Sequence, residues 1–325
     1  MLSLIFASAL MIECESFTNK GGWTLDPSSM GEMGSSYLMA HGYGVPVKDA
    51  STEFSVERTG RYRVMVRTRN WAAEWTKGAP GLFRVLTDGR ELSFVMGNNG
   101  PTWRWAMAGE IELAAGRHVL ALRDMTGFNG RCDAVVVTDG ACDEATLENL
   151  RLENQARTPV DGGTYDFIVV GGGISGICAA HASARATART LLIQDRDIVG
   201  GCNSSEIRVG LGGDIHVGPN VRLGNVVEEI QPIVGGGSVD GGEDYQDGRK
   251  MRSFRAGYIP RFLKLRTGER VFAVETNETG AIRAVLSRNV RSGVVTRFCS
   301  DLFCDATGDA VLARLAGCAT MYGRE

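Results

Sequence analysis

The sequence has few histidines and no surplus of charge of either sign. Its 325 residues include 4 histidines, and 35 Lys and Arg stand against 38 Asp and Glu, for a net charge of −3. A chain with this balance has no general field to attract a phosphate backbone, so we do not expect nucleic acid as a partner. No apolar run reaches the roughly 20 residues that span a membrane.

The 8 cysteines follow neither the spacing of zinc sites nor that of a dense disulfide framework, so most are expected to be buried thiols. They leave the cellular compartment open. Met1–Ile12 is apolar and contains the small-residue pattern Ala7-Ser8-Ala9, but it lacks a positively charged start. We prefer a weak or clipped export signal, which predicts a periplasmic or extracellular protein. The alternative is a first core strand in a cytoplasmic protein.

The length suits two domains, and the first part has an all-β pattern. Gly60–Arg67 alternates apolar and basic residues. Phe83–Thr87 followed by Asp88-Gly89 predicts a hairpin, and Ile111–Leu122 predicts a second one. Short strands between turns predict a β-sandwich of jelly-roll type over residues 13–140. The polar residues 141–163 are expected to be a linker with a short helix, followed by an α/β domain over residues 164–325.

One stretch, Asp161–Asp197, has the pattern of a βαβ unit. The apolar run Phe167–Val170 predicts a strand buried on both faces, and an alanine-rich helical pattern follows its glycine turn. Gly171, Gly173 and Gly176 fill the GxGxxG positions, which serve the tight turn, the approach of a pyrophosphate and close helix packing. The position and order of these elements predict a dinucleotide site on a Rossmann-like fold. Gln194 or Asp195 is expected to accept a ribose hydrogen bond, and the sequence leaves both open.

Two later glycine signals favour a flavin. A nicotinamide-binding fold does not need the pair Gly200-Gly201, whereas a flavin must thread past such a loop. The turn Ala306–Asp309 follows a predicted strand, after a meander over Ala281–Ser300, and Asp309 can accept a bond from a ribityl chain. The full set of expected cofactor contacts is Gly171, Gly173, Ile174, Ser175, Gly176, Gln194, Asp195, Arg196, Gly200, Gly201, Cys202, Asn203, Ser204, Ser205, Gly308 and Asp309.

Residues 161–325 resemble the FAD-dependent oxidoreductases of the glutathione-reductase-like class, in the subgroup with a GGxxSSE loop and a terminal TGD…GRE. The matching segments are Gly200–Glu206, Thr307–Asp309 and Gly323–Glu325. The resemblance implies non-covalent FAD and oxidation of a small organic substrate. Cys202 stands where that loop commonly has asparagine, and we expect a packed neutral thiol rather than a redox thiol. Such proteins usually continue past the GRE, so the chain is expected to be a fragment or a degenerate copy.

The first part resembles jelly-roll carbohydrate-binding modules, through Glu13–Phe17, Gly60–Val64, Gly116–Leu120 and Asp133–Val135. That resemblance implies a structural Ca²⁺ on Glu13, Glu15 and Asp133, since carboxylates are its preferred ligands. The alternative is three solvated strand carboxylates. Four tryptophans lie in loop-like segments and are either a surface for stacking a sugar or part of the core, namely Trp71, Trp75, Trp103 and Trp105.

His216 is the histidine nearest to the predicted flavin loop, with Glu206, Arg208 and Asp214 close to it in sequence. It is our candidate for the base that accepts a substrate proton, against an exposed loop histidine. The sequence thus predicts an FAD-dependent oxidoreductase that transfers hydride from a small organic substrate, with a glycan as one option. The alternatives are a non-catalytic carbohydrate-binding protein with a truncated nucleotide fold, and an NAD(P)-dependent enzyme, which the flavin signals disfavour.

Overall fold

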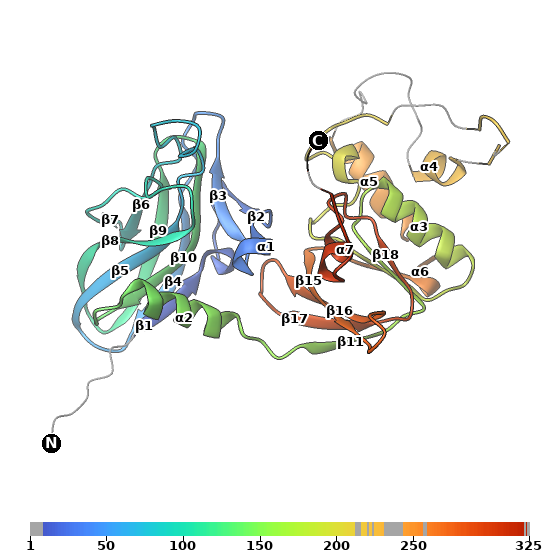
Figure 1. Cartoon of the computed structure of the whole chain (residues 1–325). Coiled ribbons are helices and arrows are strands. Elements are labelled where there is room, and N and C mark those ends of the chain that lie inside the picture. Colours follow the sequence, from blue (N-terminus) through green and yellow to red (C-terminus); the bar gives the residue numbers. More distant parts are fainter. Residues whose placement is uncertain are drawn as a thin grey trace. The chain divides into compact units, whose positions relative to one another are not determined.

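A computed structural model describes residues 9–211, 216–219, 221–222, 224–230, 243–255, 259–321 and 323. The chain divides into two compact units, Met1–Arg157 and Thr158–Glu325, whose elements are labelled in Figure 1. Each unit has its own hydrophobic core.

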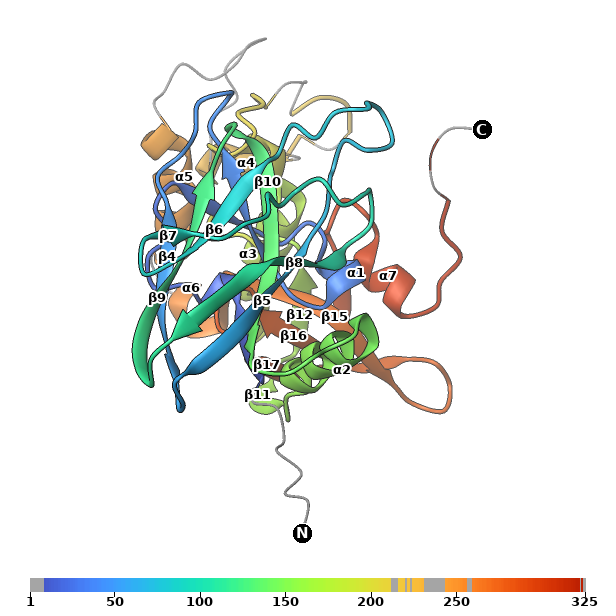
Figure 2. The same cartoon turned by 90° about the vertical axis from the view of Figure 1, so that its left-hand side faces the viewer.

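The first unit is a sandwich of two antiparallel sheets, seen from a second side in Figure 2. One sheet has the order β2-β3-β10-β5-β8, with β1 paired to β10, and the other has the order β4-β9-β6-β7. The strands are β1 (Ala9–Glu13), β2 (Trp23–Asp26), β3 (Tyr37–His41), β4 (Ala50–Val56), β5 (Gly60–Thr68), β6 (Phe83–Thr87), β7 (Arg90–Glu91), β8 (Arg104–Leu113), β9 (Gly116–Asp124) and β10 (Phe128–Thr138). The helices are η1 (Cys14–Ser16), α1 (Met30–Met33) and α2 (Glu144–Gln155).

Alternation along the strands builds the core of the sandwich. In β5, Tyr62, Val64 and Val66 are buried between the sheets while Arg61 and Arg63 are exposed, as the sequence pattern predicts. The β6–β7 hairpin is also confirmed, because Asp88 and Gly89 both have the positive φ of a type I′ turn.

The second predicted hairpin is wrong. β8 pairs with β5 in one sheet, and β9 pairs with β4 and β6 in the other. The turn between β8 and β9 therefore leads the chain from one sheet to the other, and Gly116 has a φ of +133° at this crossing. A glycine-containing turn can join two paired strands or lead the chain from one sheet to the other. The turn residues alone therefore could not predict which of the two occurs here.

The ends of the first unit differ from the expected boundaries. Residues 9–12, placed in the export segment, form most of β1, in which Ala9 pairs with Thr138 and Glu13 with Ala134. Residues 1–8 of that segment lie outside the described residues. The predicted linker helix is α2, which begins at the cap Asp143. It packs on the sandwich, where the Arg151 guanidinium donates to the carbonyl oxygen of Met33.

The second unit contains a parallel and a mixed sheet. The parallel sheet has the order β14-β13-β12-β18, and the other has the order β11-β17-β16-β15. The strands are β11 (Val160–Thr164), β12 (Phe167–Val170), β13 (Thr190–Ile193), β14 (Leu263–Arg266), β15 (Glu269–Thr276), β16 (Ile282–Asn289), β17 (Val295–Cys299) and β18 (Phe303–Asp305). The helices are α3 (Ile174–Arg185), η2 (Gly201–Asn203), α4 (Asn225–Ile230), α5 (Glu243–Ser253), α6 (Ile259–Phe262) and α7 (Val311–Leu315).

The parallel sheet is buried on both faces, which explains its continuous apolar runs. Val169 and Leu192 face one core, together with Ile177 of α3. Ile168 and Leu191 point the other way, into the core shared with the β15–β17 meander. Strand β12, helix α3 and strand β13 therefore form one βαβ unit, and its glycine turn between β12 and α3 lies at the carboxyl edge of the sheet.

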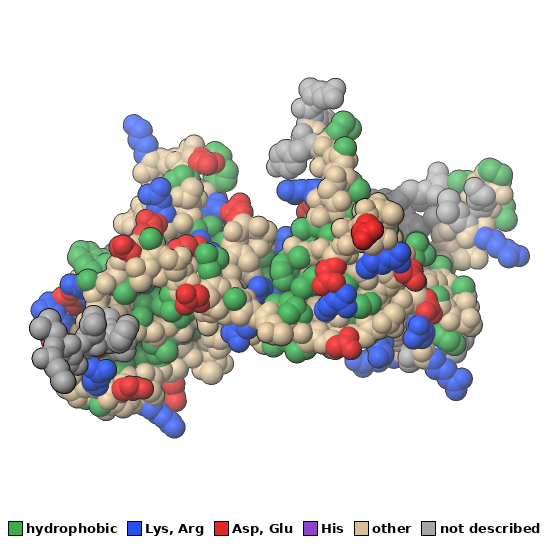
Figure 3. Space-filling model, turned by 60° about the horizontal axis from the view of Figure 1, so that its bottom comes forward, with side chains coloured by type: hydrophobic (Ala, Val, Ile, Leu, Met, Phe, Trp, Pro, Cys, Tyr) green, Lys and Arg blue, Asp and Glu red, His purple; other side chains and the backbone are tan. Residues whose placement is uncertain are grey.

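In the part of the chain that the structure describes, no helix is long and apolar enough to cross a membrane. Basic and acidic side chains are interspersed over the surface seen in Figure 3. That view shows no basic stripe, in agreement with the small net charge of −3.

Candidate functional site

The second unit has a cavity of about 700 Å³ at the carboxyl edge of its parallel sheet. Strands β12, β13 and β18 end side by side there, and each is followed by a turn that lines the cavity. Ligands of open parallel sheets bind at this edge. The cavity joins Gly173 in the first turn to Asp309 in the last, although 136 positions separate these residues in the chain.

The three fingerprint glycines have three different surroundings. Gly171 has a φ of +103°, and a Cβ there would lie 2.3 Å from the carbonyl oxygen of Ala306. A Cβ on Gly176 would lie 1.9 Å from the carbonyl oxygen of Gly171, so this glycine lets α3 pack closely. A Cβ on Gly173 would meet no atom within 4 Å, and Gly173 lines the cavity. Only Gly173 is open to a ligand, as the fingerprint predicts.

Helix α3 begins at this cavity without a side-chain cap. Gly173 is its N-cap residue, and no acidic residue lies in its first turn. Ile174 and Ser175 of that turn line the cavity. The first N–H groups of a helix have no partner within it, so they can bind an anion such as a diphosphate.

The Gly200-Gly201 loop packs directly against the glycine turn. The Gly200 N–H donates to the carbonyl oxygen of Gly172 at 2.7 Å, and a Cβ on Gly201 would lie 3.2 Å from the Cα of Gly173. Asn203 follows in η2 and is buried, with its Nδ2 donating to the carbonyl oxygen of Val209 at 2.8 Å. Its Oδ1 has no hydrogen-bond partner among the described residues. An unpaired buried amide oxygen beside a cavity is an acceptor for a ligand.

The two candidates for the ribose acceptor, Gln194 and Asp195, have different contacts in the structure. Gln194 Oε1 accepts the Gly172 N–H at 2.7 Å, and its Nε2 donates to the carbonyl oxygen of Ile198 at 3.3 Å. This amide therefore braces the glycine turn. Asp195 lines the large cavity and a smaller one of about 90 Å³ beside it, where the Arg270 Nη1 contacts its Oδ2 at 3.1 Å.

The last turn supplies Thr307, Gly308 and Asp309. Asp305 shapes this turn, because its Oδ1 accepts from Thr307 at 3.0 and 2.7 Å and its Oδ2 accepts the Ala313 N–H at 2.9 Å. Burial opposes the charge of Asp305, but these hydrogen bonds outweigh it and lower the pKa of the carboxyl group. Asp305 therefore holds the turn, whereas the exposed Asp309 side chain lies beside both cavities.

The expected cofactor residues all line the large cavity except Gly176, Ser204 and Ser205. Ser204 Oγ donates to the carbonyl oxygen of Gly201, and the Ser205 N–H donates to Asp247. Both serines therefore shape the loop from outside the cavity. Cys202 differs from the expectation in another way, since its thiol is exposed at the cavity and not packed.

His216 is not among the described residues that line the cavity. Its Nδ1 lies 2.7 Å from the carbonyl oxygen of Val221, and its Nε2 lies 3.1 Å from Glu228. These two contacts raise its pKa. His216 thus contacts Val221 in its own loop and Glu228 of α4, and it is not among the described residues that line the candidate site. Asp214, its predicted neighbour, lies outside the described residues.

The described residues do not support the predicted calcium site on Glu13, Glu15 and Asp133. Asp133 accepts from Arg67 Nη1 at 2.8 Å and from Ser35 Oγ at 3.1 Å, while Glu13 accepts from Asn154 Nδ2 at 3.0 Å. No three His, Cys, Asp or Glu side chains of the described ranges are grouped to hold a metal ion. An arginine from β5 thus neutralises the carboxylate that was expected to bind calcium.

Sequence reasoning missed the support of the Gly200–Asn203 loop by α5. Lys250 is completely buried, and its Nζ donates to the carbonyl oxygen of Asn203. Burial lowers the pKa of this lysine to about 8, against the opposing effect of Asp247. No local pattern marks Lys250, because the loop that it supports lies 47 positions earlier.

Glu206 also lines the large cavity. Its side chain is 40% exposed and lies 3.9 Å from Arg196 Nε. Partial desolvation raises the pKa of its carboxyl group, the Arg196 charge opposes this, and the negative charges of Asp195, Asp197 and Asp247 add to it. A carboxyl group with a raised pKa beside a cavity is a candidate for acid–base chemistry.

Comparison with protein families gives one match for this unit. Residues 166–325 match the family described as FAD dependent oxidoreductase. The second unit thus contains an FAD oxidoreductase domain, and the cavity lies inside the matched range. A comparison with curated proteins gives no match.

Among solved structures, this chain is similar to carbohydrate-binding modules. A family 35 module from Clostridium thermocellum is 20% identical, with 40% of this chain and 97% of the module covered and a TM-score of 0.33. The C-terminal family 6 module of a marine laminarinase from Zobellia galactanivorans is 16% identical, with 41% and 100% covered and a TM-score of 0.32. A family 35 module from Cellvibrio japonicus is 18% identical, with 41% and 95% covered and a TM-score of 0.30.

Proposed function

We propose that the FAD oxidoreductase domain binds FAD in the large cavity and oxidises a small organic substrate there. The observation that supports this most directly is the single cavity that connects the α3 N-terminus, the Gly200–Asn203 loop and the Thr307–Asp309 turn. The diphosphate would lie against the first N–H groups of α3, where Gly173 leaves space for it. Asp195 would accept the ribose hydroxyls, and Asp309 would accept from the ribityl chain.

The donor and acceptor groups present suit this cofactor. Gly173 offers an open approach, Asn203 offers an unpaired buried oxygen, and Asp195 is fixed by Arg270 at the smaller cavity. Ordinary ligand cavities measure about 300–1,000 Å³, which includes the size found here. The glutathione-reductase-like subgroup and the Rossmann-like description of the parallel sheet belong to the same proposal.

Reconstitution tests the cofactor. The purified chain should bind FAD with a visible flavin spectrum and quenched flavin fluorescence, and NAD should compete only weakly. If NAD at a concentration equal to that of FAD displaced the bound FAD, the proposal would be contradicted. The matched variants that separate binding from folding are Gly173→Ala and Gly31→Ala, because a Cβ at either position meets no neighbouring atom.

When bound, a flavin would accept a hydride from the substrate. We propose Glu206 as the group that takes the accompanying proton, in place of His216, since it lines the cavity and its pKa is raised. A Glu206→Gln variant should bind FAD normally but reduce it slowly with an active substrate, and the acidic limb of its pH–rate profile should vanish. Unchanged rates at every pH would contradict this role.

The first unit also has an exposed aromatic surface, which supports a second candidate function. Trp75 and Tyr43 are 72% and 85% exposed, and Trp71 contacts Trp75 at a centroid distance of 6.1 Å. Trp71 Nε1 donates to the carbonyl oxygen of Phe128 at 3.0 Å, which joins the segment of the two tryptophans to the start of β10. Exposed flat rings can stack on sugars. We therefore propose that this surface binds a glycan, and that the FAD domain acts on a related hydroxyl compound.

The other two candidate tryptophans have structural partners. Trp103 lies 4.9 Å from the ring of Tyr37, and Trp105 Nε1 donates to Glu148 at 3.3 Å. Binding to a panel of soluble polysaccharides should therefore be lost in Trp75→Ala and kept in Trp105→Phe. Equal binding by both variants would contradict the assignment. We also propose an exported location from the apolar start of the chain, Met1–Ile12, although residues 9–12 of that segment form most of β1.

A further inference from the structure

Two cysteines of the first unit meet inside the sandwich. Cys14 begins η1 immediately after β1, and Cys132 lies in β10. Both side chains are completely buried and belong to the core between the two sheets. The Cys14 thiol donates to the Cys132 sulfur at a distance of 3.3 Å, and 118 positions separate the two residues in the chain.

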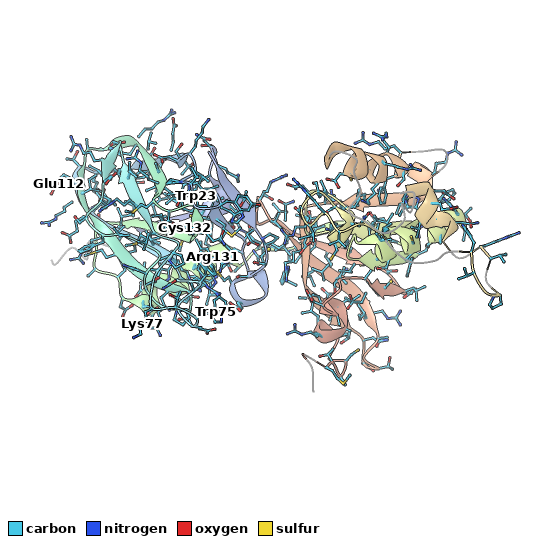
Figure 4. The ribbon with its side chains drawn as sticks, turned by 90° about the horizontal axis from the view of Figure 1, so that it is seen from above. Trp23, Trp75, Lys77, Glu112, Arg131 and Cys132 are labelled. Atoms are coloured by element: carbon cyan, nitrogen blue, oxygen red, sulfur yellow. The ribbon has the colours of Figure 1, made fainter. Side chains whose placement is uncertain are left out.

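The structure of β10 explains why Cys132 points inward. The neighbouring Arg131 stacks its guanidinium over the rings of Tyr37 and Trp71, at 5.8 and 5.6 Å. Because side chains alternate along a strand, Cys132 then faces the core. Figure 4 labels Arg131 and Cys132, together with the exposed Trp75. β1 pairs with β10, with Glu13 opposite Ala134, and Cys14, the next residue of the chain, lies beside Cys132.

We propose that Cys14 and Cys132 form a disulfide that links the first strand of the sandwich to its last. A disulfide bond is about 2.05 Å long, so each sulfur has to move by about 0.6 Å. The two thiols release two protons and two electrons. The electrons reduce the disulfide of an oxidant, either a small-molecule disulfide or a disulfide-exchange protein, to two thiols.

The bond forms while the chain folds and is protected afterwards. Burial raises the pKa of the Cys14 thiol well above its ordinary value, and Cys132, Asp133 and Glu15 add to this effect. The reduced pair in the folded chain therefore holds little thiolate, which is the form that exchanges with a disulfide, so the bond forms before the sandwich closes. Once formed it is protected by burial, because no attacking thiolate can reach either sulfur. Closing a loop of this length restricts the unfolded chain, so the disulfide stabilises the sandwich.

Counting thiols after refolding tests the proposal. The full chain is refolded from guanidinium chloride with reduced and oxidised glutathione, or with dithiothreitol alone, then unfolded again and alkylated with iodoacetamide. Mass spectrometry should find six alkylated cysteines in the glutathione sample and eight in the dithiothreitol sample. Cys132 and Cys142 share one tryptic peptide, bounded by Arg131 and Arg151, so the mapping uses Cys142→Ser.

In the Cys142→Ser chain the loss of two alkylated thiols should persist, and peptide mapping should join Cys14 to Cys132. In Cys14→Ser the loss should disappear. Eight alkylated thiols in the oxidised wild-type sample would overturn the proposal, and so would a loss that persists in Cys14→Ser. As a second measurement, dithiothreitol during refolding should lower the Tm of the first unit in the wild type but leave it unchanged in the Cys14→Ala, Cys132→Ala double variant.

Discussion

Replacing Gly173 by alanine should weaken FAD binding without weakening the fold. Gly173 caps α3 with φ −67° and ψ 178°, a conformation that alanine adopts without strain. The new methyl group would meet no protein atom within 4 Å, and it would lie at the cavity where α3 presents its N–H groups. It therefore takes the place that we assign to a phosphate oxygen.

The size of the expected loss in FAD affinity follows from the loss of one hydrogen bond to a phosphate oxygen. A methyl carbon keeps other heavy atoms at about 3.5–4.0 Å, which is beyond the 2.7–3.2 Å range of an N–H···O bond. A hydrogen bond to a charged group contributes about 1.5–3 kcal/mol. The Kd for FAD should then rise roughly 10- to 150-fold. Thermal unfolding without FAD should be unchanged.

Two further glycine variants make the comparison specific. Gly31→Ala adds a methyl group in equally open space in the first unit, so neither Kd nor Tm should change. Gly176→Ala forces its Cβ to 1.9 Å from the Gly171 carbonyl oxygen, and such overpacking costs about 1–3 kcal/mol. Flavin fluorescence titration and thermal unfolding measure both quantities. If Gly173→Ala bound FAD as tightly as Gly31→Ala, the reasoning about the α3 N-terminus would be refuted.

Three other predictions test single side chains. FAD should slow the alkylation of Cys202, which is exposed at the cavity, and leave that of the exposed Cys318 unchanged; equal rates at Cys202 with and without FAD would count against its position. Lys250→Met removes the donor to the Asn203 carbonyl oxygen, so it should lower the free energy of unfolding by about 1–3 kcal/mol and also weaken FAD binding. The control Lys264→Met, at an exposed lysine, should change neither quantity. Burial and Asp133 raise the pKa of Glu13 from 4.5 to about 7, so its stabilising contribution is complete below pH 4.5 and is lost as the pH rises through 7. Glu13→Gln should therefore stabilise the first unit by roughly 1–3 kcal/mol at pH 8 but not at pH 4, and the same difference at both pH values would contradict the shift.

Parts of the site could be predicted because their chemistry is local. The βαβ unit follows from an apolar run, a glycine turn and a helical pattern within about 30 residues, and the structure has all three in that order. The separate roles of Gly171, Gly173 and Gly176 follow from their spacing. The sequence left the choice between Gln194 and Asp195 open, and our proposal of Asp195 rests on a tertiary contact, in which the Gly172 N–H donates to the Gln194 amide oxygen.

Other expectations failed where a distant partner decided the outcome. The resemblance to carbohydrate-binding modules implied a calcium site, but Arg67 donates to Asp133 from 66 positions away. The Ala115-Gly116 turn suggested a hairpin, but β8 and β9 find their partners in different sheets. Cys202 was expected to be packed, but it is exposed where its loop lines the cavity.

The sequence by itself determined the order of the two units and the turns that can approach a dinucleotide, since strand periodicity and glycine conformation are properties of neighbouring residues. Only the tertiary structure decided which side chains meet. It joined Gly173 to Asp309 across one cavity, placed the Lys250 ammonium group under a loop far from it in sequence, and brought Cys14 to Cys132. The physical reason is that such contacts depend on how sheets pair and pack over more than 40 residues of chain, which no short pattern encodes.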